Sequence, residues 1–133
     1  MVFLNNIYFM KYLKYLKESI ISDKIEKLED LILDLKDDGL IVDIIKDNPP
    51  TFQLHDNGNY ITSINNSSSG SNIFILVYKI KNEKISKFNA NELSTISEFI
   101  RTLRSYKLDR STSGGDGFYI FRIPKRDLYN SNL

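Results

Sequence analysis

The chain has 133 residues, of which 41% are hydrophobic and 26% are charged, and its formal net charge is +1. This length and balance are typical of one folded domain with a real hydrophobic core, and they exclude wholesale disorder. The absence of cysteine excludes disulfides, thiolate chemistry and cysteine-ligated zinc or iron–sulfur sites. We predict a single domain over residues 1–124, followed by a loose polar tail over residues 125–133 in which Leu128 and Tyr129 are candidates to dock.

No stretch has the length of a membrane span, and no small-residue cleavage site follows an apolar run, so we expect a cytoplasmic protein with no membrane partner. The charges are unevenly distributed. Residues 1–78 carry 7 basic and 11 acidic side chains, whereas residues 79–133 carry 11 and 6. This asymmetry indicates a dipolar surface, which is a weaker sign of nucleic-acid binding than a uniformly basic domain.

The N-terminal pattern, from about residue 5 to residue 38, is helical, because apolar residues recur at alternating steps of four and three. One series is Phe9, Leu13, Leu16 and Ile20, and a second is Ile21, Ile25, Leu28, Ile32 and Leu35. The series shifts by one residue at Ile21, close to Asp23 and Glu26, which together form a capping-box pattern. A single bent helix is one interpretation, but the pattern favours two helices that meet near Ser22. Gly39 is placed to end the second helix in a left-handed conformation.

Carboxylates gather near the end of this helical region, at Asp30, Asp34, Asp37 and Asp38. They lack the ligand spacing of an EF-hand, so a solvated helix face is favoured over a cation site or a docking surface for a basic partner. No metal site and no cofactor are predicted.

The middle of the chain predicts four strands. Residues 40–45 form the first, and residues 51–55 and 59–64 flank an Asp-Asn-Gly sequence that is a strong hairpin signal. A serine-rich loop leads to residues 73–80, Ile-Phe-Ile-Leu-Val-Tyr-Lys-Ile, which are apolar on both faces as in a buried central strand.

The remainder predicts a helix and a last strand. Asn89 and Glu92 form a second capping box, which opens a helix with apolar positions from Leu93 to Tyr106. Residues 109–117 are expected to be a glycine-rich loop, and residues 118–123 a strand closed by Pro124. The predicted fold class is α+β, with a mostly antiparallel sheet of about five strands in the order α-β-β-β-β-α-β. A four-strand meander followed by a crossover would place the last strand parallel beside residues 73–80, or antiparallel beside residues 40–45.

No residue set predicts an enzyme. The single histidine, His55, lies beside the hairpin turn, and no serine has a nucleophile-elbow pattern around it. The glycines at 114, 115 and 117 precede a strand and lack the lysine of a phosphate-binding loop, which would precede a helix.

Two strands that are apolar on both faces need more cover than the predicted helices provide, so the first functional hypothesis is a non-enzymatic protein that self-associates or docks on a larger assembly. The candidate interaction residues are Tyr78, Tyr119 and Phe121.

The alternative is nucleic-acid binding by a basic, aromatic sheet face in the C-terminal part. Residues 117–121, Gly-Phe-Tyr-Ile-Phe, resemble the first aromatic motif of an RNA-recognition motif, and residues 73–75 resemble the second, although the topology differs. The candidate phosphate contacts are Arg101, Arg104, Lys107, Arg110, Arg122, Lys125 and Arg126.

The helix–Asp-Gly–strand sequence of residues 28–44 resembles that of small uncharacterised proteins of large tailed bacteriophages. This resemblance implies a viral accessory or virion-associated role, in the host cytoplasm or in the virion. It assigns no catalytic residue.

Overall fold

The computed structural model describes residues 2–46, 51–56, 59–65, 71–115 and 117–133. Within them, four helices and eight strands follow one another as α1 (Val2–Leu31), α2 (Leu33–Asp37), β1 (Ile41–Ile45), β2 (Thr51–Asp56), β3 (Asn59–Asn65), β4 (Asn72–Tyr78), β5 (Ile80–Lys81), β6 (Lys84–Ile85), α3 (Ala90–Ser105), β7 (Ser111–Gly114), β8 (Phe118–Pro124) and α4 (Lys125–Asn130). The α+β class and the mostly antiparallel sheet are confirmed.

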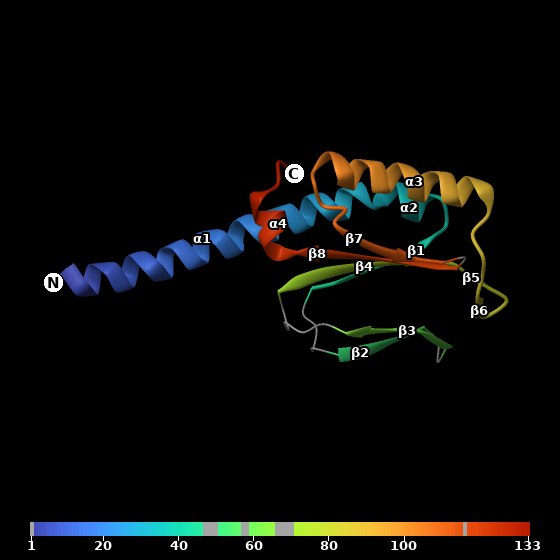
Figure 1. Ribbon diagram of the computed structural model, residues 1–133, viewed down its shortest axis with the longest axis horizontal. Coiled ribbons are helices and arrows are strands. Elements are labelled where there is room, and N and C mark those ends of the chain that lie inside the picture. The colour runs from blue at the N-terminus through green and yellow to red at the C-terminus, as the bar shows by residue number, and fades with distance from the viewer. Residues whose placement is uncertain (1, 47–50, 57–58, 66–70, 116) are drawn as a thin grey trace.

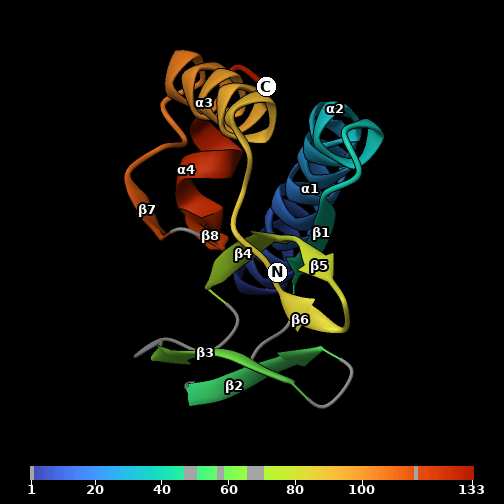
Figure 2. The same cartoon turned by 90° about the vertical axis from the view of Figure 1, so that its right-hand side faces the viewer.

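The central sheet has the order β1-β4-β8-β7, and every neighbouring pair is antiparallel. Helices α1, α2, α3 and α4 lie on one side of this sheet, and the β2–β3 hairpin lies on the other (Figures 1 and 2). The central strand β4 is buried from Ile73 to Tyr78, as its composition predicts. Cross-strand pairing places Val77 between Val42 and Tyr119, at the middle of the sheet.

The arrangement of the strands differs from the predicted meander. β1 pairs directly with β4, while β2 and β3 form a separate two-stranded sheet. The hairpin prediction is confirmed for both strands, although Asn57 and Gly58 of its turn lie outside the described residues.

The predicted parallel crossover is also present, but it ends in a different strand. Residues 111–114 were expected to be loop and instead form β7, which runs parallel to β4 because both are antiparallel to β8. β8 then returns between them, so it is antiparallel to β4 rather than parallel. The prediction for the last strand was therefore wrong. A short Ser-Thr-Ser-Gly strand has no apolar alternation, and pairing with β8 is what orders it.

Each face of the sheet is covered within the chain. On the helix side, Ile73, Ile75 and Val77 join the buried faces of α1, α2 and α3 in the main core. On the hairpin side, Leu76 and Tyr78 pack with apolar side chains that include Ile80 and Ile85 of the short β5–β6 hairpin. These residues of β4 therefore need no cover from another molecule, in contrast to what the sequence indicated.

The C-terminal residues are not a loose tail. Lys125–Asn130 form α4, and Leu128 is fully buried in the main core. One of the two residues expected to dock does so completely, and Tyr129 packs against the same core at partial exposure.

Candidate interaction surface

Helix α1 has 30 residues, and its first half extends beyond the sheet (Figure 1). We call residues 7–20 the projecting segment and residues 21–31 the buried half. Among the described residues, ten large hydrophobic side chains are exposed, and eight of them lie in the projecting segment: Ile7, Tyr8, Phe9, Met10, Tyr12, Leu13, Tyr15 and Leu16. Such a concentration of apolar surface is typical of an interaction site.

No break occurs near Ser22, so that prediction was wrong: α1 runs without interruption from Val2 to Leu31. The only interruption is at Ile32, and there helical hydrogen bonds continue, from the Ile32 N–H to the Leu28 carbonyl at 3.1 Å and from the Lys36 N–H to the Ile32 carbonyl at 3.2 Å. The capping-box residues near Ser22 therefore lie inside a helix.

The one-residue shift in the apolar pattern marks a change of face rather than a break. A step of one residue turns the stripe by roughly 100° around a continuous helix of 3.6 residues per turn. Ile21, Ile25, Leu28, Ile32 and Leu35 form the core stripe, which is buried against the sheet and α3. Phe9, Leu13, Leu16 and Ile20 form the exposed stripe, whose first three members are 59%, 42% and 41% exposed.

The sequence of the projecting segment also explains why it leaves the domain. If the core stripe is continued backwards with the same steps, it falls on Glu18, Lys14 and Lys11. Charged side chains at these positions cannot extend the main core, because burial without partners would be costly. The helix therefore continues into solvent with a different apolar face.

The buried half is fixed to the C-terminus as well as to the sheet. The Lys24 ammonium donates to the backbone carbonyls of Tyr129 at 2.8 Å and Ser131 at 2.5 Å. The Lys17 ammonium lies 5.2 Å from the centre of the Tyr129 ring, which is a cation–π distance. These contacts hold α4 against α1 at the point where the helix leaves the domain.

The three sequence-predicted interaction residues do not form one surface. Tyr78 faces the hairpin side of the sheet, is 3% exposed, and donates a hydrogen bond from its hydroxyl to Asp43 Oδ2 at 3.2 Å. Tyr119 and Phe121 pair with Val77 and Ile75 and therefore face the helices. The phenol of Tyr78 is thus on the opposite side of the sheet from the other two aromatic rings.

Packing also closes the aromatic face of β8. The Phe121 ring is 1% exposed and makes an edge-to-face contact with Phe99 of α3 at 5.3 Å between centroids. Tyr119 stacks on Phe121 at 6.2 Å and lies 5.9 Å from Phe88. Tyr119 also lines a surface cleft of about 480 Å³, together with Leu93. Neither ring is placed on an open sheet face of the kind that stacks nucleobases.

The seven basic candidates are distributed over several elements. Arg101 and Arg104 lie on α3, whereas Arg122 pairs with Phe74 across β4 and β8 and so faces the hairpin side. Lys125 and Arg126 begin α4. Two of the seven are paired with carboxylates: Arg104 Nε lies 2.9 Å from Asp109 Oδ2, and Arg110 Nε lies 3.3 Å from Asp127 Oδ2.

Lys107 and Arg110 are brought together at a polar cleft of about 240 Å³. Its other lining residues come from the end of α3, from α4 and from the C-terminus: Ser105, Tyr106, Asp127, Asn130, Ser131 and Asn132. The Asp127 side chain is 10% exposed, and its Oδ2 has the Arg110 contact but no hydrogen bond of good geometry. The cleft has both charge signs and does not form a basic groove.

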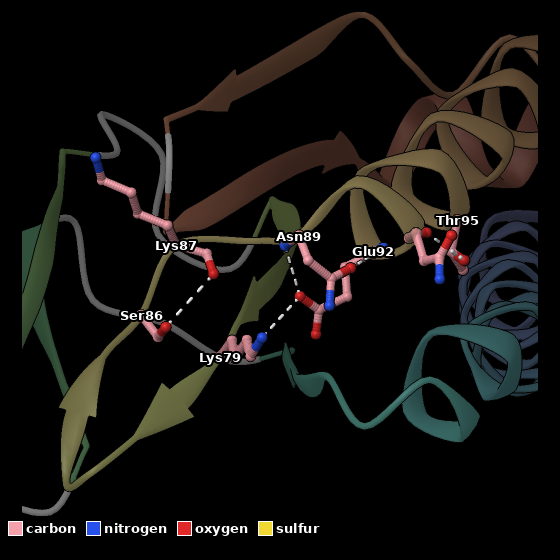
Figure 3. Close-up of polar contacts among 7 residues, drawn as sticks. Lys79, Ser86, Lys87, Asn89, Glu92 and Thr95 are labelled. Carbon is pink, nitrogen blue, oxygen red and sulfur yellow. Dashed lines mark hydrogen bonds and ion pairs between the residues drawn. The ribbon is translucent and has the colours of Figure 1, made fainter.

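A polar cluster around the buried side chain of Glu92 lies at the start of α3 (Figure 3). One oxygen of Glu92, Oε1, accepts hydrogen bonds from the Lys79 ammonium at 2.9 Å and from the Asn89 backbone N–H at 2.7 Å. The Asn89 side chain in turn accepts from the Glu92 N–H at 2.8 Å, which confirms the predicted capping box. Burial, the largest influence, raises the pKa of Glu92, but the hydrogen bonds from Asn89 and Lys79 and the Lys79 charge outweigh it, so the pKa lies below the usual value.

This cluster connects separate elements of the fold. Lys79 follows β4, and Glu92 lies in the first turn of α3, so their ion pair attaches the helix to the end of the central strand. Thr95 of the same helix donates a hydrogen bond to Asp38, which attaches α3 to the end of α2. Both contacts position the helices that cover the sheet.

Among the residues that the structure describes, no three histidine, aspartate or glutamate side chains gather as a metal site requires. The side chain of His55 lies outside them. The described residues also contain no helix long and apolar enough to cross a membrane.

Comparison with protein-family models, with curated proteins and with solved structures found no match.

The feature that sequence reasoning missed is the projecting segment itself. Its signals were present: the shift between the two apolar series and the charges at Lys11, Lys14 and Glu18 on the continued core stripe. Together they indicate that one helix has two apolar faces with different surroundings.

Proposed function

We propose that this protein is a non-enzymatic interaction protein, in which a small α+β domain presents the projecting segment of α1 to a protein surface. The observation that carries the proposal is the concentration of exposed apolar side chains on residues 7–16. On the resemblance of residues 28–44, the proposed setting is a phage accessory or virion-associated assembly.

The physical argument is that apolar surface on a rigid helix is ready to bind. An amphipathic helix docks by placing residues at spacings of three and four into a partner groove or against a partner helix. Here the helix is ordered before docking, because its buried half is packed in the core and fixed to α4. Little conformational entropy is then lost on binding, which favours affinity.

The polar arc of the same segment agrees with a surface exposed to water. This polar arc lies away from the exposed stripe and consists of Lys11, Lys14, Lys17 and Glu18. The segment therefore remains hydrated when the stripe is covered. Scattered single apolar residues would need no explanation, whereas eight of them within ten positions do.

Site-specific photo-crosslinking of the full chain tests the proposal. A photoreactive amino acid at Tyr12, in the projecting segment, should give an adduct of defined mass in cells that express the protein. The same group at Ser94, exposed on α3, is the matched control and should give none.

The adduct must also depend on the exposed stripe. Replacing both Leu13 and Leu16 by serine should abolish it without unfolding the domain, because both side chains are exposed and lie outside the main core. Failure to form any adduct from Tyr12, or equal adducts from Tyr12 and Ser94, would refute the proposed function.

A further inference from the structure

We infer that the occupant of the exposed stripe is the same stripe of a second copy, in an antiparallel pair of helices. This inference rests on the proposed function and names its partner. It starts from the spacing of Phe9, Leu13, Leu16 and Ile20, whose steps of four, three and four are the a and d positions of a heptad repeat.

The spacing is the same in both directions along the helix, so the stripe is complementary to itself. An antiparallel pair related by a two-fold axis between Lys14 and Tyr15 places Phe9 opposite Ile20 of the second copy. It places Leu13 opposite Leu16. A closed two-fold contact of this kind uses one patch on both subunits, as most homodimers do.

Charge supports the antiparallel direction. Helix α1 has no acidic residue in its first turn and no basic residue in its last, so nothing in its own sequence complements the positive end of its dipole. In the antiparallel pair, that first turn lies alongside Asp23 and Glu26 of the second copy. Both side chains are exposed and free to approach it. A parallel pair would place the two unmatched positive ends together.

The position of the domains agrees with this direction. The projecting segment extends to one side of the sheet and helices (Figure 1). An antiparallel pair therefore holds the two domains at opposite ends of the contact. A parallel pair would bring both domains, each with its α4, to the same end of the stripe.

The size of the contact sets the affinity. The projecting segment has 14 residues and is about 21 Å long. A standard stable interface uses roughly 20–30 residues per side, so this contact is smaller. We therefore expect a reversible dimer that forms at micromolar concentration or above, not an obligate one.

Light scattering of the full chain at increasing concentration is the first measurement. It should show the mass rising from one copy to two. The Leu13→Ser, Leu16→Ser double variant should need at least about ten times the concentration, since it removes the central pair of the contact. Its unchanged melting curve would show that it is still folded. A parent protein that stays monomeric up to about 1 mM would overturn the inference.

Cross-linking then tests the direction, and the absence of cysteine makes every introduced thiol unique. Leu13→Cys protein mixed with Leu16→Cys protein should oxidise to a mixed disulfide dimer much faster than either does alone. Lys14→Cys, on the polar arc, is the control and should remain slow. Rapid self-cross-linking of Leu13→Cys alone would instead show a parallel pair and overturn the inference.

The photo-adduct from Tyr12 separates this inference from the proposed function. An adduct of two identical chains supports both. An adduct with a different protein, from a chain that is monomeric alone, overturns the second-copy inference and leaves the proposed function standing. Binding to vesicles of phosphatidylcholine and phosphatidylserine with no dimer and no protein adduct would overturn both, because a lysine-bearing apolar helix can also lie on an anionic membrane.

Discussion

The two halves of α1 have the same kind of apolar pattern and opposite surroundings. In the buried half, Leu28 is 0% exposed and Ile21 and Ile25 are each 9% exposed, whereas in the projecting segment Phe9 is 59% exposed. Helix-period spacing therefore predicts a helix and an apolar face, but it does not tell whether that face belongs to the chain's own core. The charges on the continued core stripe supply that information.

The largest expected difference is between the core of the domain, here strand β4, and the projecting segment of α1, and it comes from placing a charge in each. Tyr78→Asp should unfold the protein, because Tyr78 is buried and contacts Asp43, so the new carboxylate would be unpaired and near a like charge. A cost of several kcal/mol, about 4 or more, is comparable with the whole stability of a small domain. Val77→Asp, on the helix side of β4, should do the same.

The same substitution in the projecting segment, Tyr15→Asp, is the matched control, because Tyr15 is 71% exposed. Its effect should stay within about 0.5 kcal/mol. Thermal melts of the three variants decide the matter. A Tyr78→Asp protein that melts with the parent would show that the hairpin side of the sheet is not covered within the chain.

Truncation of a leucine in each half gives the next effect. Leu28→Ala should cost about 2–5 kcal/mol, because it removes a fully buried side chain and leaves a cavity. Leu16→Ala should change the free energy of unfolding by less than about 1 kcal/mol, because Leu16 is already 41% exposed and little apolar area is lost from the core. Urea unfolding at low protein concentration measures both, below any self-association. Equal losses would mean that the projecting segment is packed against the domain in solution.

What the sequence could predict follows from local patterns. The capping box at Asn89 and Glu92, the left-handed Gly39 and the buried central strand are each determined by a few neighbouring residues, and the structure has all three. The crossover could also be predicted, because the helix of α3 is long and amphipathic. Its destination could not, because β7 has no pattern of its own and depends on pairing with β8.

The candidate site was harder because it depends on what lies against each face. Tyr78 and Phe121 have the composition of an interaction surface, yet the β5–β6 side chains and Phe99 cover them. The projecting segment has the composition of a core helix, yet the charges on its other face keep it in solvent. Burial is a property of the assembled fold, so an apolar pattern alone assigns neither surface nor core.

Acid should lower the stability of the domain through Glu92, in the first turn of α3. The pKa of this carboxylate is lowered in the folded protein, so its ionised form contributes stability at neutral pH. That contribution is lost as the pH falls below the ordinary value of 4.5 towards the folded value. Glu92→Gln should cost about 1–2 kcal/mol at neutral pH, because it weakens the capping box and leaves Lys79 without its ion pair.

The matched control is Glu98→Gln on the same helix, where the side chain is exposed. Urea unfolding at neutral and acid pH should show a smaller acid loss for Glu92→Gln than for the parent or for Glu98→Gln. Identical acid losses for all three proteins would remove Glu92 as a source of the pH dependence.

The smallest expected effect on stability concerns the residues that end helices α2 and α3 in a left-handed conformation. After α2, Gly39 has a φ of +85°, and after α3, Lys107 has a φ of +59°. The two caps have the same hydrogen-bond pattern. The N–H groups of Gly39 and Leu40 donate to the carbonyls of Lys36 and Leu35, and the N–H groups of Lys107 and Leu108 donate to the carbonyls of Arg104 and Leu103. The cap after α2 has glycine, the residue that the left-handed conformation favours, whereas the cap after α3 has a lysine in that conformation.

The two caps should therefore respond in opposite directions. An added Cβ at Gly39 meets no atom within 4 Å, so Gly39→Ala should cost only the conformational strain, about 1 kcal/mol. Lys107→Gly should stabilise the protein by roughly 0.5–1 kcal/mol, because it removes that same strain. Lys107→Ala separates the backbone from the side chain: it keeps the strain, so its stability should stay near that of the parent. If Lys107→Gly and Lys107→Ala both destabilise equally, contacts of the lysine side chain at its cleft, rather than the hydrogen bonds of the cap, hold this residue in the left-handed conformation.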